Sequence, residues 1–131
     1  MKFEIKFAGN KKINAELNGH IIKTDQEIQA GGEGSAPAPF DLFLASIGTC
    51  AGIYVKSFCD QRAITTDDLR IVQHIEYDMA KRMIGKIALE IIVPDNFPEQ
   101  YRQAVVHAAN ICAVKKHLQD PPQIETFVST K

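Results

Sequence analysis

Three cysteines, Cys50, Cys59 and Cys112, are the residues of this sequence best suited to covalent chemistry. A cysteine thiolate is a nucleophile, and it can be oxidised reversibly to a sulfenic acid or a disulfide. A cysteine in a protein core more often serves only as a small hydrophobic residue, so each of the three also has a purely structural interpretation. Which of them could react depends on the helices that carry them.

Two features favour chemistry at Cys50 and Cys112. Each lies on the apolar stripe of a predicted helix, so helices packed face to face could bring the two thiols together. Cys112 is followed about one turn later by Lys115 and Lys116 and could begin a helix, and both features favour a thiolate. Cys59 is predicted to be structural, because at about 100° per residue it falls on the opposite side of the helix from Cys50.

Other classes of site find no support in the sequence. His107, Cys112 and His117 do not have the spacing of metal ligands, and no Cys-x-x-Cys occurs, so we expect no metal and no cofactor. A net charge of -1 gives no case for binding nucleic acid or an anionic membrane. An odd number of cysteines without a signal-peptide pattern indicates the cytoplasm. The length of 131 residues predicts a single domain, residues 1–131.

The element that must position Cys50 is the stretch Pro39 to Arg62, which is predicted to form a long central helix. Pro39 suits the first helical position, and Asp41 complements the helix dipole in the first turn. No charged residue occurs between Asp41 and Lys56, so the helix must be buried by more than one layer, although its uncharged part is too short to cross a bilayer. Apolar residues that recur at helical spacing include Phe40, Phe43, Ile47 and Tyr54.

Alternation of apolar and polar residues predicts strands on both sides of this helix. An antiparallel meander is expected at residues 3–7, 13–17 and 20–24, a long hairpin at 69–79 and 84–93, and a last strand at 123–129. A second helix should begin at Pro98 and Glu99 and end at Asn110, and Cys112 should open a further short turn. The loop at residues 30–38 lacks a phosphate-binding motif and is predicted to be a flexible connection. This order defines an α+β fold.

Two landmarks resemble the OsmC/Ohr family, the osmotically inducible and organic-hydroperoxide-resistance proteins. The first is the sequence PFDLFLASIGTC at residues 39–50, which looks like the signature helix of the family. The second is CAVKKHL at residues 112–118, which is similar to the family's cysteine followed by a small residue, valine and a basic stretch. The order of strands and helices also matches, so the resemblance covers essentially the whole chain.

The resemblance implies a β3-α-β2-α(α)-β subunit in an intertwined homodimer, with sheets around paired central helices. It also implies a thiol peroxidase cycle, in which Cys50 attacks an organic hydroperoxide and becomes a sulfenic acid. Cys112 would then form a disulfide with Cys50, and an unknown dithiol reductant would reopen it. The residues that would support this chemistry are Asp41, Lys115 and Lys116, and those that would line the substrate pocket are Phe40, Phe43, Ile47 and Tyr54.

The chain is more similar to the broader OsmC-like branch than to the hydroperoxide-resistance branch. In the latter a glutamate directly follows the helix proline, where this chain has Phe40, whereas Asp41 matches the acidic position of the broader branch. The arginine that the peroxidase branch places among its first strands has no counterpart before Arg62. Three functions therefore remain open: a hydroperoxide reductase in oxidative stress defence, a small-molecule-binding, lipid-binding or redox-sensing dimer, and a structural partner of another protein. Loss of the Cys50 thiol with peroxide would distinguish the first from the others.

Overall fold

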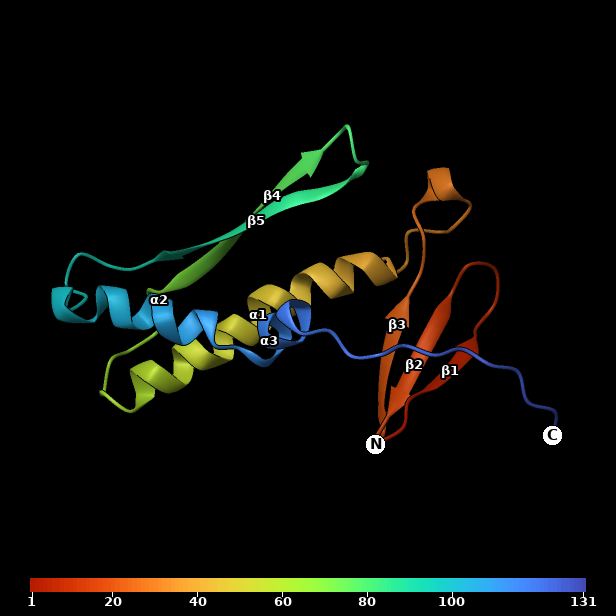
Figure 1. Cartoon of the computed structure of the whole chain (residues 1–131), viewed down its shortest axis with the longest axis horizontal. Helices are drawn as coiled ribbons and strands as arrows, with labels where there is room; N and C mark the ends of the chain where they lie inside the picture. The colour runs from red at the N-terminus through yellow and green to blue at the C-terminus, as the bar shows by residue number, and fades with distance from the viewer. The chain divides into compact units, whose positions relative to one another are not determined.

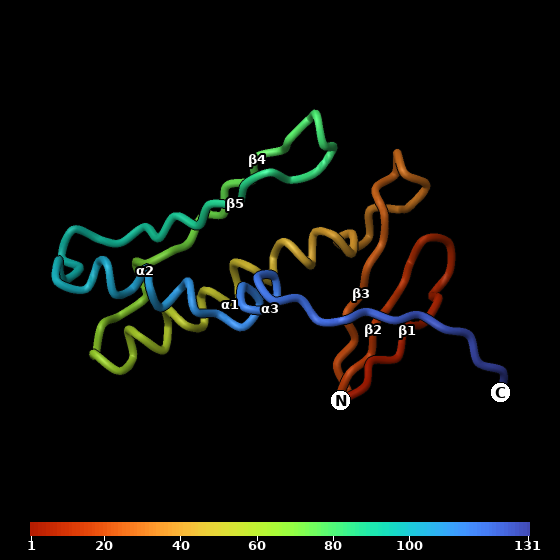
Figure 2. The backbone as a smooth tube through the Cα atoms, in the orientation of Figure 1, coloured from red at the N-terminus to blue at the C-terminus, as the bar shows by residue number.

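The computed structural model describes all residues from 1 to 131 and has the expected α+β composition (Figure 1). The contacts within the chain divide it into two compact units, residues 1–45 and residues 46–131. Figure 2 follows the path of the backbone through both units. The assignment of the whole chain to one domain stays a prediction.

The first unit is built on the predicted meander. Strands β1 (Glu4–Phe7), β2 (Ile13–Leu17) and β3 (His20–Thr24) pair antiparallel in the order β1-β2-β3. Asn18 and Gly19 both have positive φ, 50° and 83°, as a two-residue hairpin turn that matches the strand twist requires. The sequence prediction for this sheet is therefore confirmed.

The two faces of this sheet differ in polarity. Ile5, Ala15 and Ile22 lie opposite one another on one face, while Lys6, Asn14 and Lys23 lie on the other. The apolar face is largely uncovered in the single chain, because Ile5 is 56% and Ile22 40% exposed. The alternation of the strands thus presents an apolar surface that this chain leaves open.

Helix α1 (Pro39–Asp60) begins at the predicted residue, ends two residues before the predicted end, and passes from the first unit into the second. Its end is marked by Ala63, whose φ of 54° is left-handed and cannot continue the helix. By length and hydropathy α1 could cross a membrane, but core helices of soluble proteins pass the same test. The buried residues of α1 form one stripe: Ile47, Ala51, Val55 and Cys59. The single chain covers this one stripe, and burial of the other apolar sides of α1 by a second chain stays a prediction.

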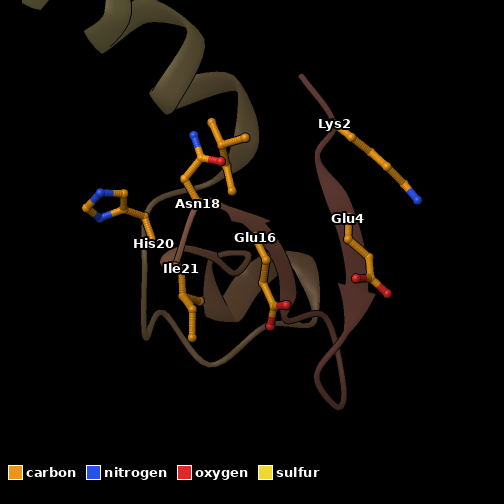
Figure 3. Close-up of a pocket in the computed structure, with 8 residues that line it drawn as sticks. Lys2, Glu4, Glu16, Asn18, His20 and Ile21 are labelled. Carbon is orange, nitrogen blue, oxygen red and sulfur yellow. The ribbon is translucent and has the colours of Figure 1, made fainter.

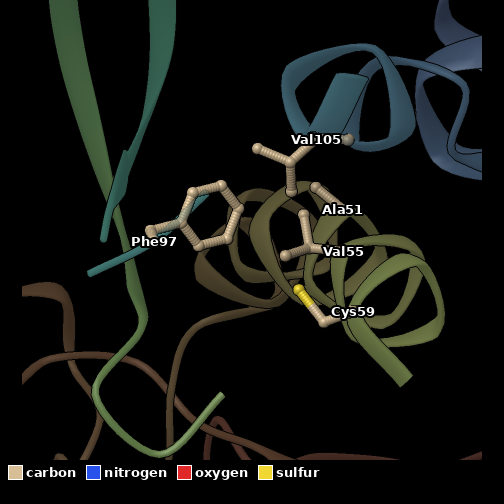
Figure 4. Packing of buried hydrophobic residues seen from close by; sticks show 6 residues of the cluster. Ala51, Val55, Cys59, Phe97 and Val105 are labelled. Carbon is tan, nitrogen blue, oxygen red and sulfur yellow. The ribbon is translucent and has the colours of Figure 1, made fainter. Parts of the chain in front are cut away.

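The second unit packs a hairpin and helix α2 (Arg102–Asn110) against this stripe. The hairpin consists of β4 (Arg70–Asp78) and β5 (Met83–Ile92), and it is followed by a 3-10 turn (Glu99–Tyr101), α2 and α3 (Ala113–Gln119). Figure 4 shows the core, in which Ala51, Val55 and Cys59 of α1 meet Phe97 and Val105. The hairpin, the second helix and the short turn after it are confirmed.

The predicted last strand at residues 123–129 is wrong, because the chain has no strand after α3. The side chains of Ile124, Phe127 and Val128 are almost fully exposed. A β-strand exists only when its backbone N–H and C=O groups pair with a neighbouring strand. The alternating sequence of this segment is compatible with a strand, but the single chain offers it no partner.

Candidate active site

Cys50 lies near the middle of α1 and is the only one of the three cysteines that is partly exposed. Cys59 and Cys112 are completely buried, and all three thiols are free. Oxidation by a dissolved reagent requires contact between the sulfur and that reagent. Cys50 is therefore the thiol that a small molecule can reach first.

Cys59 belongs to the core, in agreement with the predicted structural role. Its side chain packs with Ala51 and Val55, whose positions on α1 form the buried stripe (Figure 4). Burial raises the pKa of the Cys59 thiol, and the neighbouring Asp60 carboxylate acts in the same direction. Both effects favour the unreactive neutral thiol.

Cys112 is the N-cap of α3, as the sequence suggested. Its sulfur accepts the backbone N–H of Lys115 at 3.5 Å, so one donor of the helix terminus points at the sulfur. The Lys115 ammonium does not join this contact, since its Nζ donates to Asn110 Oδ1 at 2.8 Å. Lys116 lies in the last turn of the same helix. The backbone N–H of Lys115 therefore contacts Cys112, and a supporting role for the side chains of Lys115 and Lys116 stays a prediction.

The packing of α2 on α1 connects the segments that carry Cys50 and Cys112. Ala51 follows Cys50 directly, and it belongs to the same buried cluster as Ala109 of α2. Cys112 comes three residues after Ala109. The two thiol-bearing segments thus flank one core, and their pairing in a disulfide stays a prediction.

The four residues predicted to line a substrate pocket have different surroundings. Phe40 and Phe43 stack with ring centroids 5.5 Å apart and are 57% and 40% exposed. Tyr54 is half-buried, and Ile47 is only 3% exposed because it belongs to the buried stripe. In the single chain the exposed part of this set is the aromatic pair at the start of α1, and Ile47 is a core residue.

Two hollows in the first unit contain none of these four residues. One, of about 430 Å³, is shown in Figure 3 and is lined by Lys2, Glu4, Glu16, Leu17, Asn18, Gly19, His20 and Ile21. The other, of about 330 Å³, is lined by Ala8, Lys12, Asn14, Lys23, Thr24, Ser35 and Ala36. Charges of both signs surround the first hollow, which gives it no preference for an apolar substrate or for an anion.

Asp41 has a defined contact at the start of α1. Its Oδ2 accepts the backbone N–H of Ala38 at 3.2 Å. Ala38 is the residue before the helix and Asp41 is the third helical residue, so this contact is one half of a capping box, in which the side chain of the third helical residue accepts the N–H of the residue before the helix. The residue that the sequence placed in support of the thiol thus fixes the first turn of the helix.

The sequence reasoning missed Asp25, a completely buried carboxylate that follows β3. Its Oδ1 accepts the N–H of Gln26 at 2.7 Å. Its Oδ2 accepts the N–H of Glu33 at 3.3 Å and both the N–H and the Oγ–H of Ser35, at 3.1 and 2.6 Å. The predicted flexible connection is therefore a loop organised around one carboxylate. An aspartate ahead of a run of Gly and Ser is a known signal for such side-chain-to-backbone bonding.

We expect Asp25 to titrate far below the ordinary range. The hydrogen bond from Ser35, followed by that from Gln26, lowers the pKa of Asp25 from 3.8 to about 2. Since the pKa is lower in the folded state, Asp25 stabilises the fold fully above pH 3.8, and this contribution is lost as the pH falls to about 2. An NMR titration of the Ser35 amide should show a midpoint near pH 2 that is absent from Asp25→Asn. A midpoint at 3.8 would contradict the hydrogen-bonded arrangement.

Comparisons with known proteins add two findings. The family model described as OsmC-like protein matches residues 32–127, a range that contains Cys50, Cys59 and Cys112. No curated protein matches the sequence.

Solved structures with a similar fold have low sequence identity. A stress-induced and detoxification response protein from Psychrobacter arcticus is 18% identical with a TM-score of 0.74, over 88% of this chain and 86% of that one. The organic hydroperoxide resistance protein OsmC from Legionella pneumophila is also 18% identical, with a TM-score of 0.57 over 91% and 90% of the two chains. OhrB of Bacillus subtilis, another organic hydroperoxide resistance protein, is 17% identical with a TM-score of 0.55 over 92% and 93%. At these identities the likeness concerns the fold.

Proposed function

Because the chain belongs to the OsmC-like protein family, we propose that it reduces organic hydroperoxides with Cys50 as the attacking thiol, in defence against oxidative stress. The observation that carries this proposal is the contrast among the three cysteines. Cys50 is partly exposed in the middle of the central helix, whereas Cys59 and Cys112 are completely buried. A peroxidase of this type needs one accessible thiol to meet the substrate and a second thiol that can reach the resulting sulfenic acid.

The proposed cycle balances without a cofactor. The Cys50 thiolate attacks the terminal oxygen of ROOH, the O–O bond breaks, and Cys50 becomes a sulfenic acid while the alkoxide takes a proton to leave as ROH. The Cys112 thiol then attacks the sulfenic sulfur, and water leaves as the disulfide forms. A dithiol reductant then reduces the disulfide to two thiols and is itself oxidised to a disulfide. Dithiols are the usual source of such electrons in the cytoplasm, where we propose that the protein acts. The sum is ROOH and a dithiol converted to ROH, water and a disulfide.

The aromatic pair at the start of α1 supports a preference for bulky substrates. Phe40 and Phe43 present exposed rings on the helix that carries Cys50, and Tyr54 lies one turn beyond that cysteine. Burial of hydrocarbon against such rings contributes roughly 25 cal/mol per Å². We propose that an organic hydroperoxide gains this energy and that hydrogen peroxide does not. Ile47, a core residue, and Asp41, a helix cap, would support the site from within α1.

The test is stopped-flow measurement of thiol loss at Cys50 with cumene hydroperoxide and, in parallel, with hydrogen peroxide. We expect oxidation by both, faster with cumene hydroperoxide, and a rate that rises with pH because the thiolate is the attacking species. Protein that loses no thiol with either peroxide would refute the proposed function and favour the ligand-binding alternative.

Mild oxidation of the folded protein should give a disulfide between Cys50 and Cys112 within one chain and leave Cys59 reduced. The reason is that Cys59 lies on the same helix as Cys50 but on its opposite side, so the two sulfurs cannot meet while α1 is intact, and burial raises the pKa of the Cys59 thiol. Peptide mapping by mass spectrometry reads the pairing. In Cys112→Ser the first oxidation of Cys50 should still occur, but the product should accumulate as sulfenic or sulfinic acid. A principal disulfide that contains Cys59 would overturn this assignment.

A further inference from the structure

Asp25 is the one acidic residue that the chain buries completely. A buried carboxylate costs free energy unless hydrogen bonds compensate for its lost water. Asp25 receives four of them, one on Oδ1 and three on Oδ2. These hydrogen bonds hold the backbone of Gln26, Glu33 and Ser35 around one carboxylate.

The contacts of Asp25 lead directly to the start of α1. Beyond its carboxylate, the backbone N–H of Asp25 donates to the carbonyl of Pro37 at 3.2 Å, which closes the loop of residues 26–38 at its far end. The next residue, Ala38, donates its N–H to Asp41 in the first turn of the helix. Both ends of the loop are therefore tied, one to Asp25 and the other to the helix cap.

Gly32 shows how little room remains inside this loop. A Cβ at residue 32 would lie 2.0 Å from the backbone oxygen of Gln26 and 2.8 Å from Asp25 Oδ1. The first of these atoms is backbone and cannot move aside without moving the loop. The Asp25 carboxylate and the backbone of the loop thus pack so closely that residue 32 has no room for a side chain.

The helix start held in this way carries the stacked pair Phe40 and Phe43. We propose that Asp25 is a positioning residue, which fixes the loop of residues 26–38 and through it the orientation in which Phe40 and Phe43 meet the apolar group of a bulky hydroperoxide. Asp25 touches neither the thiol nor the substrate in this inference, which rests on the proposed function. Its expected effect is therefore on the selection of substrates, beyond any effect on stability.

Asp25→Asn is the informative substitution because it keeps the size of the side chain and removes the charge. An amide has one oxygen, so one of the two positions now occupied by carboxylate oxygens would present an NH₂ group to backbone N–H donors. Ser35→Ala is a milder second variant that deletes only the 2.6 Å bond. Thr24→Val is the matched control, since Thr24 is buried next to Asp25 but its Oγ1 donates to Ile13 within the sheet.

The measured quantity is the ratio of the rate constants for Cys50 oxidation by cumene hydroperoxide and by hydrogen peroxide. Misplacement of a group that orients the substrate lowers a rate by one or two orders of magnitude, so we expect this ratio to fall about tenfold in Asp25→Asn. Ser35→Ala should lower it less, and Thr24→Val should keep the wild-type ratio. Hydrogen exchange at the Glu33 and Ser35 amides reports loop order independently, and both should lose protection in Asp25→Asn.

An equal loss of rate with both peroxides would assign Asp25 a purely structural role and overturn the inference. An unchanged ratio of the two rate constants, in a variant whose Glu33 and Ser35 amides have lost protection, would overturn it as well. If Asp25→Asn does not fold, Ser35→Ala decides between the same outcomes. Wild-type protein that reacts with neither peroxide refutes the proposed function instead. The inference is then tested by the ratio of the rates at which N-phenylmaleimide and iodoacetamide alkylate Cys50. Asp25→Asn must lower this ratio, and an unchanged ratio overturns the inference.

Discussion

Replacing Cys50 by serine should abolish peroxide consumption, with a fall in rate on the order of 10³-fold or more, the scale on which an essential nucleophile acts. A serine hydroxyl is not ionised near neutral pH and cannot form a sulfenic acid, so the first step of the cycle has no substitute. Cys112 cannot take over readily, because it is completely buried in the folded chain. Consumption of cumene hydroperoxide in the presence of dithiothreitol measures the effect.

Cys59→Ala is the control for this experiment. It removes a second thiol from the same helix, and that thiol is buried in the core. We expect its rate to equal that of the wild type, while its thermal stability falls because the smaller side chain leaves the core underpacked. Rapid turnover by Cys50→Ser, or loss of turnover in a folded Cys59→Ala protein, would move the chemistry away from Cys50.

Elements defined by local periodicity could be predicted from the sequence. The alternation in residues 3–7 and 13–17 places Ile5 and Ala15 on one face, and their register pairs them as expected. Pro39 and the uncharged run after Asp41 specify the start of α1, because a proline and an acid in the first turn act through the backbone of that turn alone. Cys112 at the cap of α3 belongs to the same class of local signals.

Features that depend on distant partners were the ones missed. The partners of Asp25 include Glu33 and Ser35, eight and ten residues away, and they converge on it only when the loop has folded. The strand expected at residues 123–129 failed for the same reason, since pairing needs an edge that the sequence of the strand does not contain.

We expect the protein to be an obligate homodimer. The single chain leaves apolar side chains exposed on each of its layers: Ile5 on the sheet of the first unit, Ile53 on α1 at 59%, Tyr77 on the hairpin of the second unit and Phe127 in the C-terminal segment. Monomeric soluble proteins rarely expose apolar patches of more than a few hundred Å², and obligate dimers bury about 2,000 Å² or more. A second copy of the chain is the partner that the family resemblance implies.

Dissociation of such a dimer should coincide with its unfolding, so the melting temperature should depend on protein concentration. We expect a decrease of about 3 °C for each tenfold dilution, measured by circular dichroism. Ile53→Asp would place a charge on the exposed apolar side of α1, where the interface is proposed, and should lower the melting temperature strongly or prevent folding. Lys56→Gln, at an exposed position one turn later whose lysine pairs with Asp60, is the control and should change it little. Two results together would contradict the dimer: sedimentation of the wild type as a folded monomer at micromolar concentration, and an Ile53→Asp variant as stable as the control. The apolar faces of the sheet and of α1 would then be stable in water.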